Sequence, residues 1–197
     1  MCPVVFSIPG QTEKRKTMRI KKENSVGLII DIQEKLFPVM WEKEELLTKY
    51  TMLIKGLNEL EVPLVVSQQY TRGLGETIEE IRPLIADLSP FEKREFSCCD
   101  EASISLKLEQ LQAKNVIICG IESHVCVLQT AIDLKASGMN PVVVMDCVSS
   151  RTPENIEMTK ERFRFEGIMM TSVESILFEL TRSSASPKFK TISKLVK

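Results

Sequence analysis

The sequence predicts an α/β fold, a three-layer α/β/α sandwich around a parallel sheet of roughly six strands. Short apolar runs, nearly continuous in Val, Ile and Leu, alternate with longer segments of helical spacing. This pattern is typical of parallel strands that helices cover on both faces. Right-handed crossovers between strands then place the helices in two layers. With 197 residues, the chain is long enough for one domain with a sizeable core.

The first 18 residues differ from the rest of the chain, because they combine Pro3, Pro9 and Gly10 with a basic stretch at 14–16. A secretory signal carries its basic residues before its apolar part, whereas here they follow it. We expect residues 1–18 to form a disordered tail and residues 19–197 to form one domain. An organellar leader is the alternative for the tail.

Six runs rich in apolar residues predict the strands. They are residues 26–30, 63–67, 91–96, 116–119, 141–145 and 168–170. The run at 91–96 is the weakest, because four of its six residues are charged.

Apolar residues at helical spacing predict the helices between these strands. The predicted helices are 42–60, 101–112, a segment from Cys126 to Gly138, 153–166, 173–182 and a small amphipathic helix within 187–197. Pro153 fits the first turn of its helix, and Ser172 fits an N-cap. The apolar residues expected to define the helix at 101–112 are Ile104, Leu106, Leu108 and Leu111. The last helix is expected to pack on the body of the domain or on a partner subunit.

The composition argues against several classes of protein. A net charge of −1 gives no electrostatic basis for binding nucleic acid or an anionic membrane. No apolar run approaches the roughly 18 residues that a membrane span needs. The six cysteines show no CxxC spacing, so we expect reduced thiols in the cytoplasm rather than disulfides or a zinc site. No dinucleotide fingerprint occurs, and no cofactor is predicted.

The segment 120–126, Gly-Ile-Glu-Ser-His-Val-Cys, follows an apolar strand and opens a helix. Ligands of open α/β sheets bind at the carboxyl ends of strands. At the start of a helix, the dipole lowers the pKa of a thiol, and backbone N–H groups can stabilise an oxyanion. We therefore expect Cys126 to be a nucleophile with a lowered pKa.

The chain has one histidine, His124, two residues before Cys126. Residues two apart on a helix do not face each other, so His124 is a poor base for this thiol. A single histidine also excludes a multi-histidine metal site. If Cys126 is a nucleophile, its base must be a carboxylate and its charge partner a Lys or Arg.

Asp31 follows the first predicted strand and therefore lies at the same sheet edge as Cys126. A carboxylate there can accept the thiol proton and return it to a leaving group. A helix N-cap or a solvated loop residue is the alternative role for Asp31. Lys93 and Arg94 are both candidates for the cation, and strand alternation lets only one of them point inward.

Three aromatic residues, Phe37, Trp41 and Tyr70, follow the carboxyl ends of the first two strands. They could form the wall of a substrate pocket, to which Gln33 could also contribute. Packing in the core or at a subunit interface is the alternative. A loop with two glycines, at 70–75, could act as a flap or be a plain surface loop.

Several motifs, in order across residues 25–197, resemble those of the isochorismatase-like cysteine hydrolases, which include nicotinamidases and N-carbamoylsarcosine amidases. The main matching segments are 28–33 (Leu-Ile-Ile-Asp-Ile-Gln), 91–97 (Phe-Glu-Lys-Arg-Glu-Phe-Ser) and 120–127. Shorter matches resemble the subgroup of isochorismatase domain-containing proteins. They lie at 69–75, 96–98, 126–130 and 187–195.

The resemblance implies the Rossmann-like sandwich of this family and a catalytic triad of Asp31, Lys93 and Cys126. It thereby selects Lys93 over Arg94 as the cation.

The resemblance also implies a cis peptide bond between Ile121 and Glu122. The oxyanion donors that it implies are the backbone N–H groups of Val125 and Cys126.

The implied activity is hydrolysis of an amide or carbamoyl C–N bond of a small molecule through a thioester on Cys126. No metal is expected, because the chain lacks the two histidines of the nicotinamidase metal site. The family also implies a homo-oligomer, a dimer or larger. The alternatives are a non-catalytic binding or scaffold protein and a protein in which Cys126 responds to oxidants. The near-zero net charge disfavours a nuclease.

Overall fold

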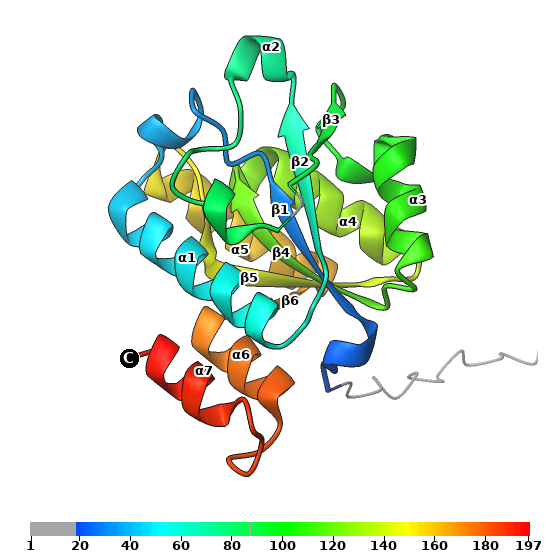
Figure 1. Ribbon diagram of the computed structural model, residues 1–197. Helices are drawn as coiled ribbons and strands as arrows, with labels where there is room; N and C mark the ends of the chain where they lie inside the picture. The colour runs from blue at the N-terminus through cyan, green and yellow to red at the C-terminus, as the bar shows by residue number, and fades with distance from the viewer. Residues whose placement is uncertain (1–18, 87) are drawn as a thin grey trace, which may run out of the picture.

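The computed structural model describes residues 19–86 and 88–197, so the tail predicted over 1–18 lies outside the described residues. The chain forms a six-stranded sheet in the order β3-β2-β1-β4-β5-β6, and every pair of neighbouring strands is parallel. Helices cover both faces of this sheet (Figure 1), which confirms the predicted α/β sandwich.

The six strands fall on the six predicted segments. They are β1 (Ser25–Ile30), β2 (Leu64–Gln69), β3 (Phe91–Lys93), β4 (Asn115–Ile121), β5 (Asn140–Ser149) and β6 (Met169–Thr171). The predicted strand at 91–96 is half as long in the structure, because the chain turns away from the sheet after Lys93.

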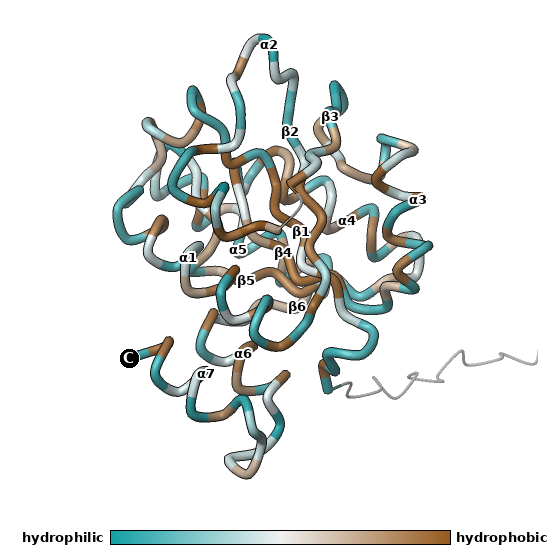
Figure 2. The backbone as a smooth tube through the Cα atoms, viewed as in Figure 1, coloured by the Kyte–Doolittle hydropathy of each residue, from teal (hydrophilic) through white to brown (hydrophobic). Residues whose placement is uncertain are grey.

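Two hydrophobic cores lie on opposite faces of the sheet, and Figure 2 shows the most hydrophobic stretches gathered on the central strands. Since side chains alternate along a strand, Leu28 and Ile30 face one core while Ile29 faces the other. Helices α1, α6 and α7 cover the core of Ile29, and α3, α4 and α5 cover that of Leu28. The helices are α1 (Lys43–Glu59), α2 (Thr71–Leu74), α3 (Ala102–Gln110), α4 (Leu128–Ala136), α5 (Pro153–Glu166), α6 (Val173–Thr181) and α7 (Phe189–Leu195). Within the described ranges, no helix has both the length and the apolar character needed to cross a membrane.

Several local predictions can be checked against these elements. The helix predicted at 101–112 is present as α3; of its apolar residues, Ile104 and Leu108 are buried, and Leu106 lies between them on the exposed side. The loop predicted at 70–75 contains the short helix α2. The Ser172 cap is confirmed, since its hydroxyl accepts a hydrogen bond from the Ser175 N–H. The last helix packs on α1 and α6 of the same chain, with Ile192 fully buried.

The strand order reverses direction at one place in the sheet. From β1 the chain adds β2 and β3 on one side, and it then returns to add β4, β5 and β6 on the other. The segments that follow β1 and β4 therefore leave the sheet side by side and turn toward opposite layers. Such a switch point opens a crevice at the carboxyl edge of an α/β sheet, where ligands bind.

Close contact between β1 and β4 depends on Gly120. Its φ of +132° lies in the region that favours glycine, and a Cβ atom there would lie 2.1 Å from the Ile30 carbonyl oxygen. The partner atom belongs to the backbone of the neighbouring strand, so it has little freedom to move. A side chain at this position would push apart the two strands that flank the crevice.

We expect Gly120→Ala to lower the free energy of unfolding by more than about 3 kcal/mol, because backbone strain adds to the clash. Gly138→Ala is the matched control. Its φ is +88°, but nothing lies within 4 Å of an added Cβ, so strain alone should cost about 1 kcal/mol. Urea denaturation of both variants measures the difference. Equal losses would contradict the assigned role of the β1–β4 contact.

Candidate active site

Asp31 directly follows β1 at the crevice, and its carboxylate is fully buried. The strand register pairs Ile30 with Ser67 of β2, so the Ser67 hydroxyl reaches Asp31 and donates a hydrogen bond to Oδ1 at 2.7 Å. Oδ2 accepts a hydrogen bond from Lys93 Nζ, also at 2.7 Å. Asp31 is therefore neither a helix N-cap nor a solvated loop residue.

Lys93 is the inward-pointing cation, and Arg94 points outward over the ring of Tyr70, 4.1 Å from its centroid. The Lys93 ammonium also donates to Gln69 Oε1 at 2.6 Å and to the carbonyl oxygens of Glu95 and Phe96 at 3.2 Å each. Burial, the largest single influence, lowers the pKa of Lys93, but the charge of Asp31, the thiols of Cys126 and Cys98 and the hydrogen bond to Asp31 together outweigh it, so the pKa is raised. The ammonium therefore stays protonated although it is enclosed.

Cys126 is only 7% exposed, and its environment holds the proton on the sulfur. Burial, followed by the charge of Asp31, raises the pKa of the Cys126 thiol well above its usual range, and Lys93 only partly opposes this. The lowered pKa that the sequence predicted is thus wrong. The helix-terminus argument took no account of desolvation or of the neighbouring carboxylate.

The turn that carries Cys126 is not the start of a regular α-helix. The peptide bond between Ile121 and Glu122 is cis, and residues Ser123–Val127 form a π-helical turn before α4. The Val125 N–H donates to the Glu122 carbonyl at 3.1 Å, and the Val127 N–H donates to the same oxygen at 3.3 Å. Because the Val125 N–H already donates to Glu122, it could bind an oxyanion only by sharing its proton between the two acceptors.

Three polar residues around the ion pair were not predicted from the sequence. Ser67 and Gln69 bind its two charges, and Cys98 is a second, fully buried thiol next to it. Cys98 Sγ lies 3.7 Å from Ser67 Oγ, and burial raises the pKa of this thiol to about 12. Ser67 and Gln69 could have been suspected, because they end β2 at the same edge as Asp31. Nothing in the sequence indicates how near Cys98 lies.

The four candidate pocket residues lie in different surroundings. The buried Gln33 side chain holds the loop after β1 to the backbone of Gln69 and Gly75, with distances of 2.7–2.9 Å. Phe37 is buried in the core against Tyr50. Tyr70 stacks under Arg94, as described above. Trp41 lines a cavity.

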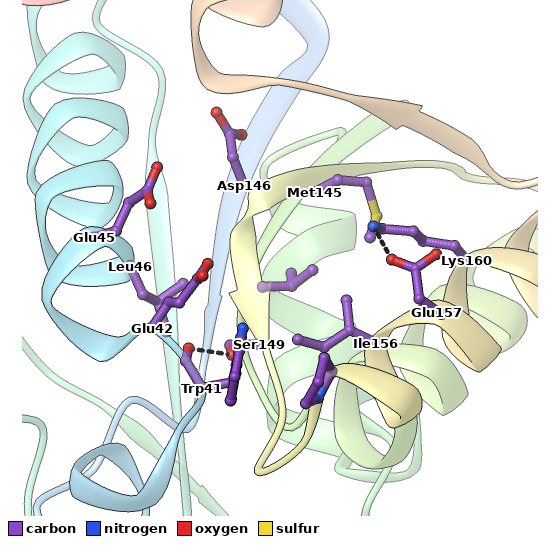
Figure 3. A pocket seen from close by; sticks show the side chains of 12 residues that line it. Trp41, Glu42, Glu45, Leu46, Met145, Asp146, Ser149, Ile156, Glu157 and Lys160 are labelled. Carbon is purple, nitrogen blue, oxygen red and sulfur yellow. Dashed lines mark hydrogen bonds and ion pairs between the residues drawn. The ribbon is translucent and has the colours of Figure 1, made fainter.

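That cavity has a volume of about 260 Å³ and lies between α1, the end of β5 and α5 (Figure 3). Around Trp41 stand the acidic side chains of Glu42, Glu45, Asp146 and Glu157. The Ser149 hydroxyl donates to the Trp41 carbonyl oxygen at 2.9 Å and forms part of the wall. None of Asp31, Lys93 and Cys126 lines this cavity, so it is separate from the ion pair.

The described cysteines show neither disulfides nor metal clusters. All five cysteines within residues 19–86 and 88–197 are free thiols. Over the same ranges, no group of three or more His, Cys, Asp and Glu side chains is placed to hold a metal ion. The chemistry that these residues offer is a thiol, a carboxylate and an ammonium brought together at one sheet edge.

Sequence comparison places the chain among known proteins. A family model described as the isochorismatase domain matches residues 25–175. The secreted isochorismatase effector Isc1 of Phytophthora sojae is 38% identical over 183 residues, which cover 91% of this chain and 87% of the effector. Isochorismatase domain-containing protein 2 of Danio rerio is 32% identical over 178 residues, covering 90% and 89% of the two chains.

Solved structures with the same fold include one protein described as a ribonuclease and one described as a hydrolase. The MAR1 ribonuclease of Caenorhabditis elegans has a TM-score of 0.83 and 36% identity, covering 91% of this chain and 92% of that one. The YcaC protein of Escherichia coli, described as an octameric hydrolase of unknown specificity, has a TM-score of 0.86, with 91% and 89% covered. Its 17% identity supports a shared fold only.

We expect Asp31→Asn to lower the pKa of the Cys126 thiol, because it removes the negative charge that raises this pKa and leaves Lys93 in place. Lys93→Met should raise the pKa further. Both shifts can be measured by following the ultraviolet absorbance of the thiolate as a function of pH. Subtracting the titration of the same variant that also carries Cys126→Ala removes the contribution of the other thiols.

Arg94→Met is the control for these titrations, since it removes a neighbouring cation that points away from the crevice. It should leave the thiolate titration unchanged. If Asp31→Asn raised the pKa of Cys126, the assigned electrostatics of the site would be wrong.

Proposed function

The chain belongs to the isochorismatase family, as its motifs predicted, and from that membership we propose that it is a cysteine hydrolase of small amides or carbamoyl compounds. The observation that carries the proposal is the fully buried Lys93–Asp31 ion pair, 2.7 Å long, beside the Cys126 thiol. Burying two charges costs free energy, and function is a common reason to retain them. We assign Asp31, Lys93 and Cys126 as the catalytic triad.

In the first half of the reaction, Asp31 accepts the proton of the Cys126 thiol as the sulfur adds to the substrate carbonyl carbon. The carbonyl π electrons move to its oxygen, and the backbone N–H of Cys126, with the shared N–H of Val125, stabilises this oxyanion. Asp31 then donates the proton to the leaving nitrogen. The C–N bond breaks, the amine leaves, and an acyl group remains on Cys126 as a thioester.

In the second half, Asp31 takes a proton from water while the water oxygen adds to the thioester carbonyl. The C–S bond then breaks, the sulfur recovers a proton from Asp31, and the acid product leaves. Lys93 keeps its charge throughout, which stabilises the Asp31 carboxylate between proton transfers. The raised thiol pKa fits this route, because the nucleophile is formed only as the bond forms and no free thiolate is required.

We expect a panel of primary amides and carbamoyl compounds to contain at least one that acylates Cys126. Rapid acid quenching followed by peptide mass spectrometry should locate the adduct on Cys126 in the wild type. Cys126→Ala and Asp31→Asn should each reduce turnover by at least about 10³-fold, because nucleophile and base act as one unit.

Cys99→Ser is the matched control for this experiment, because Cys99 is a partly buried residue whose thiol donates to the Thr130 carbonyl and whose backbone N–H donates to the Ser97 hydroxyl oxygen. It should keep full turnover. Turnover that survives in Cys126→Ala, or an adduct on another residue, would contradict the proposed nucleophile.

A ribonuclease is the second candidate, because the C. elegans protein that is 36% identical to this chain is described as a ribonuclease. A net charge of −1 provides little general attraction for RNA. Incubating the purified protein with single- and double-stranded RNA tests this candidate. RNA cleavage that Cys126→Ala and Asp31→Asn leave unchanged would favour a nuclease site elsewhere.

We place the protein in the cytoplasm and treat residues 19–197 as one catalytic domain. The free state of the five described cysteines supports a reducing compartment. Fractionation of cells that express the full chain tests the placement.

We also propose that the protein is a homo-oligomer. On α5, Met158 and Phe165 are 71% and 85% exposed, and their spacing of two turns puts them on one face. Exposed apolar side chains that share a face are typical of an interface. The octameric state described for the YcaC protein of E. coli is compatible with such a contact in this fold.

We expect Phe165→Glu to reduce the molecular mass in solution toward that of a 22.3 kDa monomer, because a carboxylate would be desolvated at the interface. Size-exclusion chromatography with light scattering measures this. Leu106→Glu, on the exposed side of α3, is the control and should leave the mass unchanged. A wild type that is already monomeric at micromolar concentration would contradict the proposal.

A further inference from the structure

A chain of buried hydroxyl groups connects the single histidine to the core behind the π-helical turn. His124 Nδ1 lies 2.8 Å from Ser150 Oγ, and Ser150 Oγ lies 2.6 Å from Ser123 Oγ. Ser123 Oγ is 3.4 Å from Thr159 Oγ1. The three hydroxyl residues are buried, and the triad chemistry uses none of them.

The direction of these hydrogen bonds can be worked out from the number of protons. The Thr159 hydroxyl donates to the Asn155 carbonyl at 2.7 Å, so it has no proton left for Ser123. If His124 Nδ1 carries no proton, Ser150 donates to Nδ1 and Ser123 donates to Ser150, which makes two short bonds. If Nδ1 is protonated, both bonds reverse, and the Ser123 proton is left with the long contact to Thr159. The neutral imidazole with its proton on Nε2 therefore satisfies this chain best.

Ser150 joins three segments that meet at the crevice. Its hydroxyl binds two residues of the π-helical turn, as described above, and its carbonyl accepts a hydrogen bond from the Trp41 N–H at 2.9 Å. Ser150 itself directly follows β5. The turn that carries Cys126 and the loop that follows Asp31 are thus both held to the end of β5 by one residue.

We propose that His124 is a positioning residue that, through Ser150 and Ser123, holds the π-helical turn so that the Cys126 thiol faces Asp31. A histidine suits this task because Nδ1 is a fixed acceptor on a short, stiff side chain. The proposal rests on the nucleophilic role of Cys126. The proposal assigns a function to His124, the one histidine, although none of the described hydrogen bonds joins it to Asp31 or Lys93.

The start of the π-helical turn and the end of β5 are also joined by an ion pair that lies outside the hydroxyl chain. Arg151 Nε and Glu122 Oε2 form an ion pair of 2.9 Å, in which the arginine is largely exposed. Glu122 is 15% exposed and Arg151 is 60% exposed, and an ion pair whose cation is this solvated contributes little to stability. Arg151→Ala is therefore a matched control, because it cuts a connection between the same segments without touching the hydroxyl chain.

The test uses iodoacetamide as the probe of Cys126, with peptide mass spectrometry as the readout. We expect His124→Leu to slow alkylation of Cys126 roughly tenfold, because Asp31 takes up the thiol proton as the sulfur attacks iodoacetamide, and a small displacement of the sulfur from this base has a large effect on rate. Ser150→Ala should have a similar effect. His124→Asn should restore most of the rate, because its side-chain oxygen can accept the Ser150 proton. Arg151→Ala should match the wild type.

Nitrogen-15 NMR of the full-length protein adds a readout that does not depend on a variant folding. The chain has one histidine, so its imidazole signals need no assignment. We expect the Nε2-protonated tautomer, with Nδ1 shifted as an acceptor. A protonated Nδ1 near neutral pH would overturn the proposal, and so would equal alkylation rates in His124→Leu and the wild type.

The two proposals can fail separately. If no amide is hydrolysed but alkylation still depends on His124 and is rescued by Asn, the positioning role holds and the proposed function fails. If amides are hydrolysed through Cys126 but the alkylation rate of Cys126 is the same with and without His124, the proposed function holds and the positioning role is wrong.

Discussion

The buried ion pair of Lys93 and Asp31 is the constraint on which the rest of the site depends. Neither charged side chain is exposed to bulk solvent, so the protein must supply the partners that bulk water would have supplied. Ser67 satisfies the carboxylate, and Gln69 with two backbone carbonyls satisfies the ammonium. These partners lie at the carboxyl edge of the sheet, which explains why strand register, rather than any single loop, positions the chemistry.

The ion pair also determines how the thiol can react. Desolvation and the Asp31 charge disfavour a free thiolate, while the same carboxylate is the group placed to accept the proton. In the proposed reaction, the nucleophile therefore forms only as the sulfur attacks, and the thiol stays protonated between turnovers. The separate cavity beside Trp41 contains none of these groups, so its size does not make it the reaction site.

The order of strands and helices could be predicted from the sequence because buried parallel strands leave continuous apolar runs. The choice between Lys93 and Arg94 could not be made from spacing, since it depends on the register of β3 against β2. The thiol pKa was predicted in the wrong direction, because desolvation depends on packing that no local pattern encodes. Ser67, Cys98 and the hydroxyl chain from His124 join residues far apart in the sequence, and short polar side chains give no periodic signal.

The most direct test of the central role of this ion pair is a double-mutant cycle on the free energy of unfolding with Asp31→Asn, Lys93→Met and the double variant. Each single change should cost about 3–5 kcal/mol, because it leaves a buried charge or polar group without its partner. The double variant should cost less than the sum, with a coupling free energy of about 2–3 kcal/mol. Additive losses, within about 0.5 kcal/mol, would contradict the central claim that these two charges hold each other in the core.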